Sequence, residues 1–142
     1  MIQKISLHDD FQVLAQLLND SFGTVARDFG LTIENCRTNS AFITSEELKS
    51  QLAENREFYS FNNSVVSVGF VAIERASGDF GVFYIEKLAV HPDFRHDGIG
   101  EKLLRFAESR IEELGGNRIS ISLIDSNTPL KKMVYKTRVH NN

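Results

Sequence analysis

The sequence has no tryptophan, little cysteine or proline, and no excess of positive charge. Its single cysteine, Cys36, excludes an intrachain disulfide and a cysteine-based metal cluster. Two prolines and nine glycines among 142 residues exclude collagen-like and linker-rich chains. The 16 Lys and Arg residues against 19 Asp and Glu give a net charge of −3, which argues against broad binding to nucleic acid or an acidic membrane. These features favour a protein of the reducing, cytoplasmic compartment.

Long hydrophobic runs are absent too. The longest, residues 65–73, is interrupted by Ser67 and Gly69 and is far shorter than the roughly 20 residues of a membrane-spanning helix. The first residues alternate between apolar and polar side chains and do not lead into the apolar core of a signal peptide. With 42% hydrophobic residues, a chain of this length can bury a sizeable core, so residues 1–142 are expected to form one domain.

Hydrophobic periodicity predicts an α+β fold with its elements in the order βααβββαβ. The strands are expected at residues 2–7, 57–62, 65–74, 82–90 and 118–124, and the helices at 11–22, 45–53 and 99–114. Thr44 and Glu47 have the spacing of a capping box at the start of the second helix, and residues 23–43 before it show no regular period. Short connections make the three middle strands antiparallel, whereas the last strand follows a helical crossover and should run parallel to the strand at 82–90. This is a mixed, mostly antiparallel sheet flanked by helices and followed by a short polar tail.

The segment between the strand at 82–90 and the helix at 99–114 carries the strongest chemical signal. From Leu88 to Gly100 it reads LAVHPDFRHDGIG. A helix that begins here leaves about four backbone N–H groups unpaired and directs the positive end of its dipole outward. Gly98 and Gly100 lack side chains that would block a close approach, and Arg95 adds a full positive charge. The combination indicates a site for a phosphate or pyrophosphate.

Three kinds of phosphate-binding loop can be compared with this segment. A Walker loop needs Lys and then Ser or Thr after its last glycine, but Gly100 is followed by Glu101 and Lys102. A Rossmann fingerprint needs a third glycine where Leu103 stands, and its first glycine directly after the strand. The third pattern, Arg-x-x-Gly-x-Gly preceded by Leu-Ala-Val-His-Pro, resembles the acetyl-CoA-binding motif of the GCN5-related N-acetyltransferase (GNAT) superfamily. The order of elements also fits, so the resemblance covers nearly the whole chain; a glycine-rich helix start without function and a nucleotide-binding protein are the alternatives.

The resemblance implies a site for acetyl-CoA, the co-substrate, built largely from backbone groups. The pantetheine arm would pair with residues 88–90 much as a strand would, and the pyrophosphate would lie against residues 95–100. The thioester would lie where the family's sheet splays, between the strands at 82–90 and 118–124. The residues assigned to this site are Leu88, Ala89, Val90, Arg95, His96, Asp97, Gly98, Ile99, Gly100 and Asn127. Asn127 matches the family's cofactor-contacting asparagine and can equally cap a helix before Thr128 and Pro129.

Glu86 is the candidate general base. Transfer to an amine needs a group that takes a proton from the ammonium form. By strand alternation Glu86 shares one face with Tyr84, Leu88 and Val90, inside an otherwise apolar run, where burial would make a carboxylate a stronger base. The alternative is an exposed Glu86, or one paired with Lys87 or Arg118. A bulge in this strand, usual in the family, would change the alternation.

Tyr135 is the candidate general acid toward the departing thiolate. The family's tyrosine follows its asparagine by seven residues, whereas Tyr135 follows Asn127 by one residue more. The four histidines, including His91 in the loop, show no metal-ligand spacing, so no metal is expected.

The C-terminal segment departs from the family pattern. Val134 occupies the tyrosine's usual place, and no Gly-Phe pair follows. Reading the codons of Met133 and Val134 one base later always gives tryptophan, because ATG followed by G contains TGG, and permitted codons then restore the tyrosine and the Gly-Phe pair. We therefore expect a shortened or frame-shifted end without closing strands. The strand at 118–124 would then be an open edge, which favours a homodimer.

The sequence thus predicts an N-acetyltransferase that transfers the acetyl group of acetyl-CoA to a primary amine by direct attack. The acceptor would be a small molecule or a peptide, and neither nucleic acid nor a membrane is expected as a partner. Direct transfer needs no nucleophile, so Cys36 is assigned no catalytic role. The alternative is a catalytically impaired acyl-CoA-binding module, which the unusual C-terminal segment favours.

Overall fold

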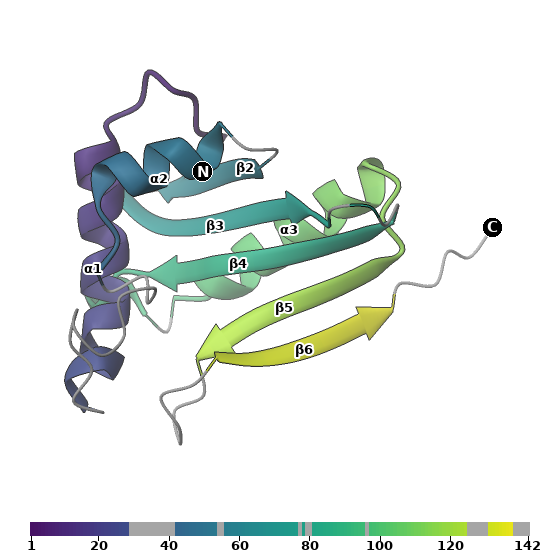
Figure 1. Cartoon of the computed structure of the whole chain (residues 1–142). Coiled ribbons are helices and arrows are strands. Elements are labelled where there is room, and N and C mark those ends of the chain that lie inside the picture. Colours follow the sequence, from purple (N-terminus) through teal and green to yellow (C-terminus); the bar gives the residue numbers. More distant parts are fainter. Residues whose placement is uncertain are drawn as a thin grey trace.

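The computed structural model describes residues 1–28, 42–53, 56–76, 78, 81–95, 97–124 and 131–137, whose arrangement Figure 1 shows. In chain order the elements are β1 (Ile2–Lys4), α1 (Phe11–Asp28), α2 (Ser45–Leu52), β2 (Arg56–Asn62), β3 (Ser67–Arg75), β4 (Val82–Val90), the short 3-10 helix η2 (Pro92–Phe94), α3 (Ile99–Glu113), β5 (Arg118–Ile124) and β6 (Lys131–Thr137). The predicted α+β class and the predicted order of strands and α-helices through β5 are confirmed. None of the helices in the described ranges is long and apolar enough to cross a membrane.

The described strands form one mixed sheet in the order β1-β2-β3-β4-β5-β6. Neighbouring strands are antiparallel except for β4 and β5, which are parallel because α3 carries the chain back across the sheet. This confirms the predicted direction of β5.

β6 is a correction to the sequence analysis, which treated the residues after 124 as a polar tail. It pairs with β5 along its whole length, from Arg118↔Thr137 to Ile124↔Lys131. The expected open edge of β5 is therefore wrong, and the homodimer expected through that edge loses its basis. Met133, Val134 and Tyr135 are compatible with a strand in spite of the surrounding lysines, and lysine is common on edge strands.

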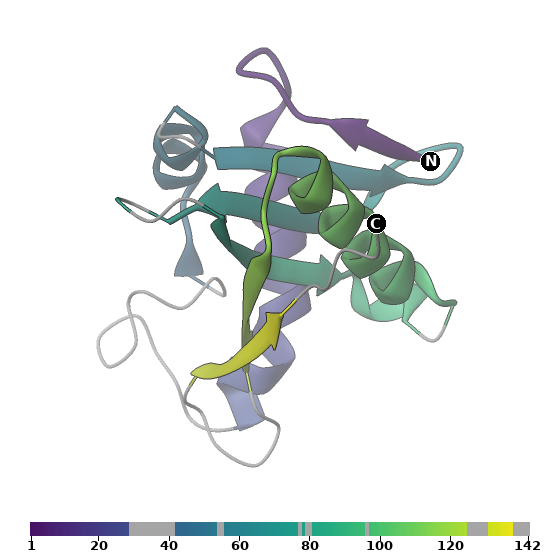
Figure 2. The same ribbon diagram turned by 90° about the vertical axis from the view of Figure 1, so that its right-hand side faces the viewer.

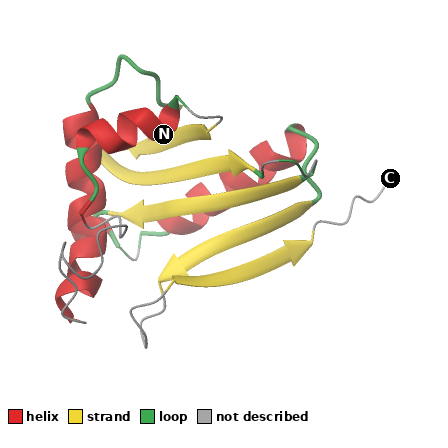
Figure 3. Cartoon of the chain, in the orientation of Figure 1, coloured by secondary structure: helices red, strands yellow, loops and turns green. Residues whose placement is uncertain are grey.

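Helices cover both faces of the sheet (Figure 3). Figure 2 shows α3 in front of the sheet and α1 behind it. α1 and α2 pack on one face against a core that includes Phe58, Phe70 and Ala72. α3 packs on the other face against Phe83 and Ile119. The sheet therefore buries apolar side chains on both sides, which fixes the position of each helix relative to β4.

Two predicted helix starts are confirmed. Asp10 accepts hydrogen bonds from the backbone N–H groups of the first turn of α1, at 3.0 and 3.3 Å. Thr44 and Glu47 form the predicted capping box at α2. α1 is longer than predicted and continues through Gly23 to Asp28, since packing can outweigh the weak helix propensity of a single glycine.

β3 begins two residues later than predicted. The side chain of Asn63 accepts hydrogen bonds from the N–H groups of Val65 and Val66, both at 2.8 Å. These bonds hold the two valines in the turn between β2 and β3, where both side chains are exposed.

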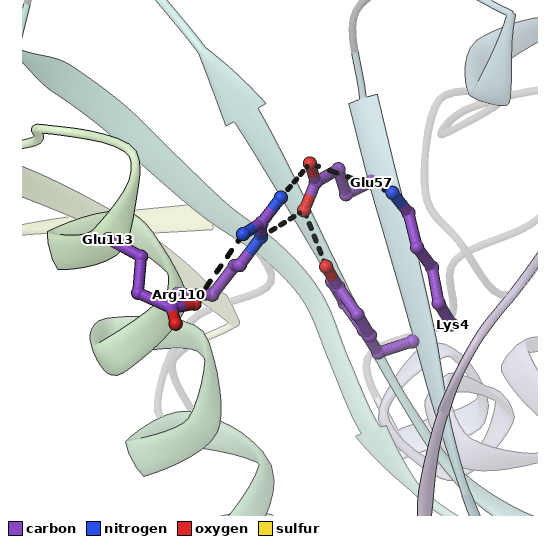
Figure 4. Close-up of polar contacts among 5 residues, drawn as sticks. Lys4, Glu57, Arg110 and Glu113 are labelled. Atoms are coloured by element: carbon purple, nitrogen blue, oxygen red, sulfur yellow. Dashed lines mark hydrogen bonds and ion pairs between the residues drawn. The ribbon is translucent and has the colours of Figure 1, made fainter.

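A cluster of charged side chains ties α3 to β2 (Figure 4). Arg110 of α3 donates from Nε and Nη2 to the two carboxylate oxygens of Glu57, at 2.9 and 3.0 Å. Tyr59 donates its hydroxyl to the same carboxylate, and Lys4 Nζ lies 3.9 Å from it. The hydrogen bonds from Arg110 lower the pKa of Glu57, while burial, followed by the bond to Glu57, raises the pKa of Tyr59 to about 12. The cluster lies on the α3 face of the sheet.

Candidate functional site

β4 and β5 run side by side only over their first halves. Their ladder extends from Val82↔Arg118 to Ile85↔Ile121, and the strands then diverge toward their C-terminal ends (Figure 1). Within the described ladders, residues 86–90 pair with β3 but not with β5. An extended molecule can therefore approach the β5 side of this stretch and pair with its backbone as a strand would. The predicted splay is confirmed.

A bulge at Lys87 begins where the β4–β5 ladder ends. Lys87 has a φ of 56°, and the register between β3 and β4 shifts between Phe70 and Ala72. Such a left-handed conformation is uncommon for a residue with a side chain, and a bulge re-aims the side chains that follow it. The bulge that the resemblance implied is confirmed.

The bulge separates Glu86 from the residues with which it was expected to share a face. Phe83 and Ile85, before the bulge, belong to the core under α3, and Leu88 and Val90, after it, pack against the same core. Because strand side chains alternate, Glu86 points to the opposite face, the one covered by α1 and α2. The expectation that Glu86, Leu88 and Val90 share one face is therefore wrong.

The loop after β4 is anchored to α1. His91 Nδ1 accepts a hydrogen bond from the backbone N–H of Asp93 at 3.1 Å, and Nε2 lies 3.7 Å from the carboxylate of Asp20. Arg95 donates from Nη2 to the backbone carbonyl of Ser21 at 2.6 Å. Arg95 thus holds the loop in place as well as supplying the positive charge that the sequence indicated. These contacts position the start of α3 beside the end of β4.

The start of α3 is open to a ligand. Gly98 is the N-cap with a φ of 77°, a conformation that favours glycine, and no side chain of the described residues caps the helix there. Among these residues, leaving out chain neighbours and the backbone of the helix itself, a Cβ atom at Gly98 would meet no heavy atom within 4 Å, and one at Gly100 would meet only Val90 Cγ2, at 3.6 Å. The N–H groups of the first turn and the positive end of the helix dipole therefore face accessible space, as an anion site requires.

An ion-paired triad lies on the α1 and α2 side of the sheet, next to the bulge. Arg56 Nε donates to Glu86 Oε1, and its Nη2 lies next to Glu74 Oε2, both at 3.0 Å. The side chains of Arg56 and Glu86 are only 17% and 18% exposed, and that of Glu74 is 29% exposed. Lys87 and Arg118 were possible partners of Glu86 from the sequence, whereas the structure shows Arg56 in contact with it.

Polar groups continue from this triad toward β6. In the strand registers Tyr84 lies opposite Glu74 on one side and Ser120 on the other. Ser120 is fully buried, and its hydroxyl has no hydrogen-bond partner in the part of the chain that the structure describes. Ser120 also lies opposite Tyr135, so the candidate acid is on β6, two strands from Glu86.

The structure brings most of the predicted site residues together. Leu88, Ala89 and Val90 line the diverging end of β4, and Arg95, Asp97, Gly98, Ile99 and Gly100 follow in the loop and the first turn of α3. His96, Asn127 and Cys36 lie outside the described residues. Among the described residues, no group of three or more His, Cys, Asp or Glu side chains could hold a metal ion.

β4 thus diverges from β5 before the loop that leads to the start of α3, a geometry that suits an extended molecule ending in phosphate groups. The model of the acetyltransferase (GNAT) domain matches residues 28–137, most of the chain. This chain belongs to the GNAT family. The family assignment agrees with the motif from Leu88 to Gly100, which lies within the matched range.

Solved structures of other GNAT proteins share the fold. The PaiA N-acetyltransferase of Thermoplasma acidophilum, in complex with coenzyme A, is 18% identical; the match covers 90% of this chain and 81% of that one, with a TM-score of 0.68. A GNAT acetyltransferase of Elizabethkingia anophelis with acetyl-CoA bound is 18% identical; the match covers 88% of this chain and 65% of that one, with a TM-score of 0.61. The aminoglycoside 6'-N-acetyltransferase of Enterococcus faecium is 19% identical; the match covers 86% of this chain and 61% of that one, with a TM-score of 0.60. This GNAT chain therefore spans less than two thirds of the last two proteins. No curated protein sequence matches it.

Arg56 is the site residue that sequence reasoning missed. It lies 30 positions from Glu86 in the sequence and belongs to a different strand. The register of two consecutive antiparallel pairs, Arg56↔Glu74 and then Ala72↔Glu86, would have indicated its position. Hydrophobic periodicity alone does not supply that register.

Proposed function

We propose that this GNAT protein is an acetyl-CoA-dependent N-acetyltransferase that transfers the acetyl group to a primary amine by direct attack. The observation that carries the proposal is the divergence of β4 from β5 directly before the uncapped start of α3. Family membership supports the transferase class.

The residues at this place fit coenzyme A. The stretch 88–90 has backbone groups on the β5 side that no described ladder uses, which suits an amide-containing arm. Gly98 and Gly100 leave open the space in front of the helix start, which suits a pyrophosphate. Arg95 adds a cation whose guanidinium also holds the loop to α1. When bound, acetyl-CoA would supply the acetyl group as a reactive thioester.

Glu86 is proposed as the group that takes a proton from the acceptor ammonium. Its carboxylate is mostly shielded from solvent and lies just before the bulge, on the strand whose end holds the cofactor residues. A free amine has the lone pair that the reaction needs, and an ammonium does not, so removal of this proton precedes attack. Tyr135 is proposed as the proton donor to the departing sulfur.

The acceptor is proposed to be a small-molecule or peptide amine. The carboxylates of Glu74 and Glu86 on the α1 and α2 side of the sheet would attract an ammonium group. The displacement of Tyr135 from the family's usual spacing favours a second candidate, a module that binds acyl-CoA with little or no turnover.

An acetyl-transfer assay against pooled primary amines tests the proposal. We expect release of free coenzyme A only when an amine pool is present, and loss of about 100-fold or more in kcat in Glu86→Gln, with acetyl-CoA affinity nearly unchanged. The loss should become smaller at high pH, because free amine then forms without a base. Saturable acetyl-CoA binding without transfer to any pool would instead support the binding module, and an unaltered pH–rate profile in Glu86→Gln would remove Glu86 as the base.

A further inference from the structure

We propose that Arg56 is a positioning residue for Glu86, which holds the carboxylate in place and in the ionised form that can accept a proton from the acceptor amine. The inference rests on the proposed function, since it takes Glu86 as the base. It adds a residue from β2 to a site otherwise built from β4, α3 and β6.

The contact between the two side chains is direct. Arg56 Nε donates to Glu86 Oε1 at 3.0 Å, and the two side chains are 17% and 18% exposed. An ion pair shielded to this extent is screened by salt less than a surface pair is. The bond occupies one carboxylate oxygen, and a carboxylate has a second oxygen on which a proton can be accepted.

The guanidinium is itself held from two other elements. Its Nη2 lies 3.0 Å from Glu74 Oε2 on β3, and its Nη1 donates to the backbone carbonyl of Gln51 in α2 at 3.5 Å. The planar fork of arginine can make several such bonds at fixed angles, which lysine cannot do. Arg56 therefore has a defined orientation, and this orientation fixes the direction of Glu86.

Further charged or titratable residues lie on the strands next to Glu86. Glu74 contributes a second negative charge, and Tyr84 is the titratable group two residues before it on β4. Lys87 follows Glu86 in the bulge, and Arg118 begins β5 opposite Val82.

Among the buried side chains of α1 and α2 on the same face, Leu18 and Leu48 are apolar, and the hydroxyl of Ser21 donates to the backbone carbonyl of Leu17. With a carboxylate on each side of Arg56, removal of this cation leaves two like charges close together. Protonation of one carboxylate relieves that repulsion.

The test follows the carboxyl carbon of Glu86 by ¹³C NMR as the pH is varied, with the resonance identified by its loss in Glu86→Gln. In Arg56→Gln the midpoint of this titration should move to higher pH. The acidic limb of the kcat/KM profile for the amine should move by the same amount, while acetyl-CoA affinity stays within about twofold, a difference well below one tenfold step. Arg56→Lys keeps a cation and should restore most of both shifts.

Arg110→Gln is the matched control. It breaks a comparable arginine–carboxylate pair, with side chains 30% and 21% exposed, on the opposite face of the sheet. A merely structural effect of losing such a pair would appear in both variants. We expect Arg110→Gln to lose stability without moving the Glu86 titration or the acidic limb.

The possible results separate the inference from the proposed function. An unchanged Glu86 titration in Arg56→Gln overturns the inference, whatever the activity. If the Glu86 titration shifts but the acidic limb of the kcat/KM profile does not move, Glu86 is not the base. If the wild-type protein transfers no acetyl group, the proposed function is wrong. Either result also removes this role for Arg56.

If Arg56→Gln does not fold, Glu74→Gln supplies the same test with the opposite sign. It removes the carboxylate that competes for Arg56 and repels Glu86, while Arg56 keeps its bond to the carbonyl of Gln51, so the midpoint should fall. An unchanged midpoint would overturn the inference.

Discussion

Each face of the sheet has an arginine that contacts carboxylate groups, and we assign different roles to the two arginines. Arg110 binds Glu57 through two parallel hydrogen bonds and joins α3 to β2. Arg56 instead lies between Glu74 and Glu86, next to the bulge and the diverging strands. The first pair contributes to stability, and the second is the one that we connect to proton transfer.

The pair on the α3 face gives stability a defined pH dependence. The pKa of Glu57 is lowered below its ordinary 4.5 in the folded protein, chiefly by the hydrogen bonds from Arg110. A lowered pKa means that the ionised form is favoured by folding, so this contribution is present above pH 4.5 and is lost as the pH falls through the folded-state pKa. Arg110→Gln should therefore cost about 1–2 kcal/mol at pH 7 and progressively less as acid protonates Glu57 in the folded protein. Urea unfolding at a series of pH values checks this, and a cost that is the same at both ends would contradict it.

At the scale of elements, the start of α3 carries the cofactor hypothesis. Gly100→Glu would place an anion where the pyrophosphate is expected, at the positive end of the helix dipole. A Cβ at Gly100 would lie 3.6 Å from Val90 Cγ2, an ordinary van der Waals contact, so the variant should fold. We expect calorimetry to show a loss of at least about tenfold in coenzyme A affinity, or roughly 1.4 kcal/mol.

Gly100→Ala is the control for this substitution. It adds the Cβ without the charge, and its affinity should stay within about threefold of the wild type, or roughly 0.7 kcal/mol. Equal affinity of the folded Gly100→Glu variant and the wild type would show that the pyrophosphate binds elsewhere.

The sequence was most informative where local signals agree. β4 and β5 have the predicted bounds and α3 has the predicted start, because strand alternation gives way to helical periodicity at a glycine pair and returns after Gly115 and Gly116. The face of Glu86 could not be read in this way, since the bulge at Lys87 reverses the alternation. The triad was not predicted because its members come from three strands, and their meeting depends on register and not on local pattern.

At the scale of the whole molecule, the C-terminal segment belongs to the sheet through β6 and is not a polar tail. Residues 131–137 complete a sheet whose edge is β6 and not β5. The charged residues of this strand, Lys131, Lys132 and Lys136, are of the kind that discourages pairing with another chain. A strand at this place is also compatible with the proposed role of Tyr135, which lies opposite the buried Ser120.

The frame-shift hypothesis for this segment is a prediction about the gene. Shifting the reading frame by one base at Met133 should place tyrosine at position 134, followed by a Gly-Phe pair. Sequencing the codons of residues 131–140 tests this directly. Codons whose shifted reading gives neither the tyrosine nor the Gly-Phe pair would show that Val134 and Tyr135 belong to a divergent but intact strand.

We propose that acetyl-CoA binds along the diverging end of β4 and at the start of α3. The most direct measurement is a titration of the ¹⁵N-labelled protein with acetyl-CoA, followed through the backbone amide resonances. We predict saturable shifts of the amide resonances that are largest for Leu88–Val90 and Gly98–Gly100. The shifts should be small for Glu57 of β2 and for Arg110 in the last turn of α3. Saturable shifts centred on other residues, or no shifts at millimolar acetyl-CoA, would contradict the claim.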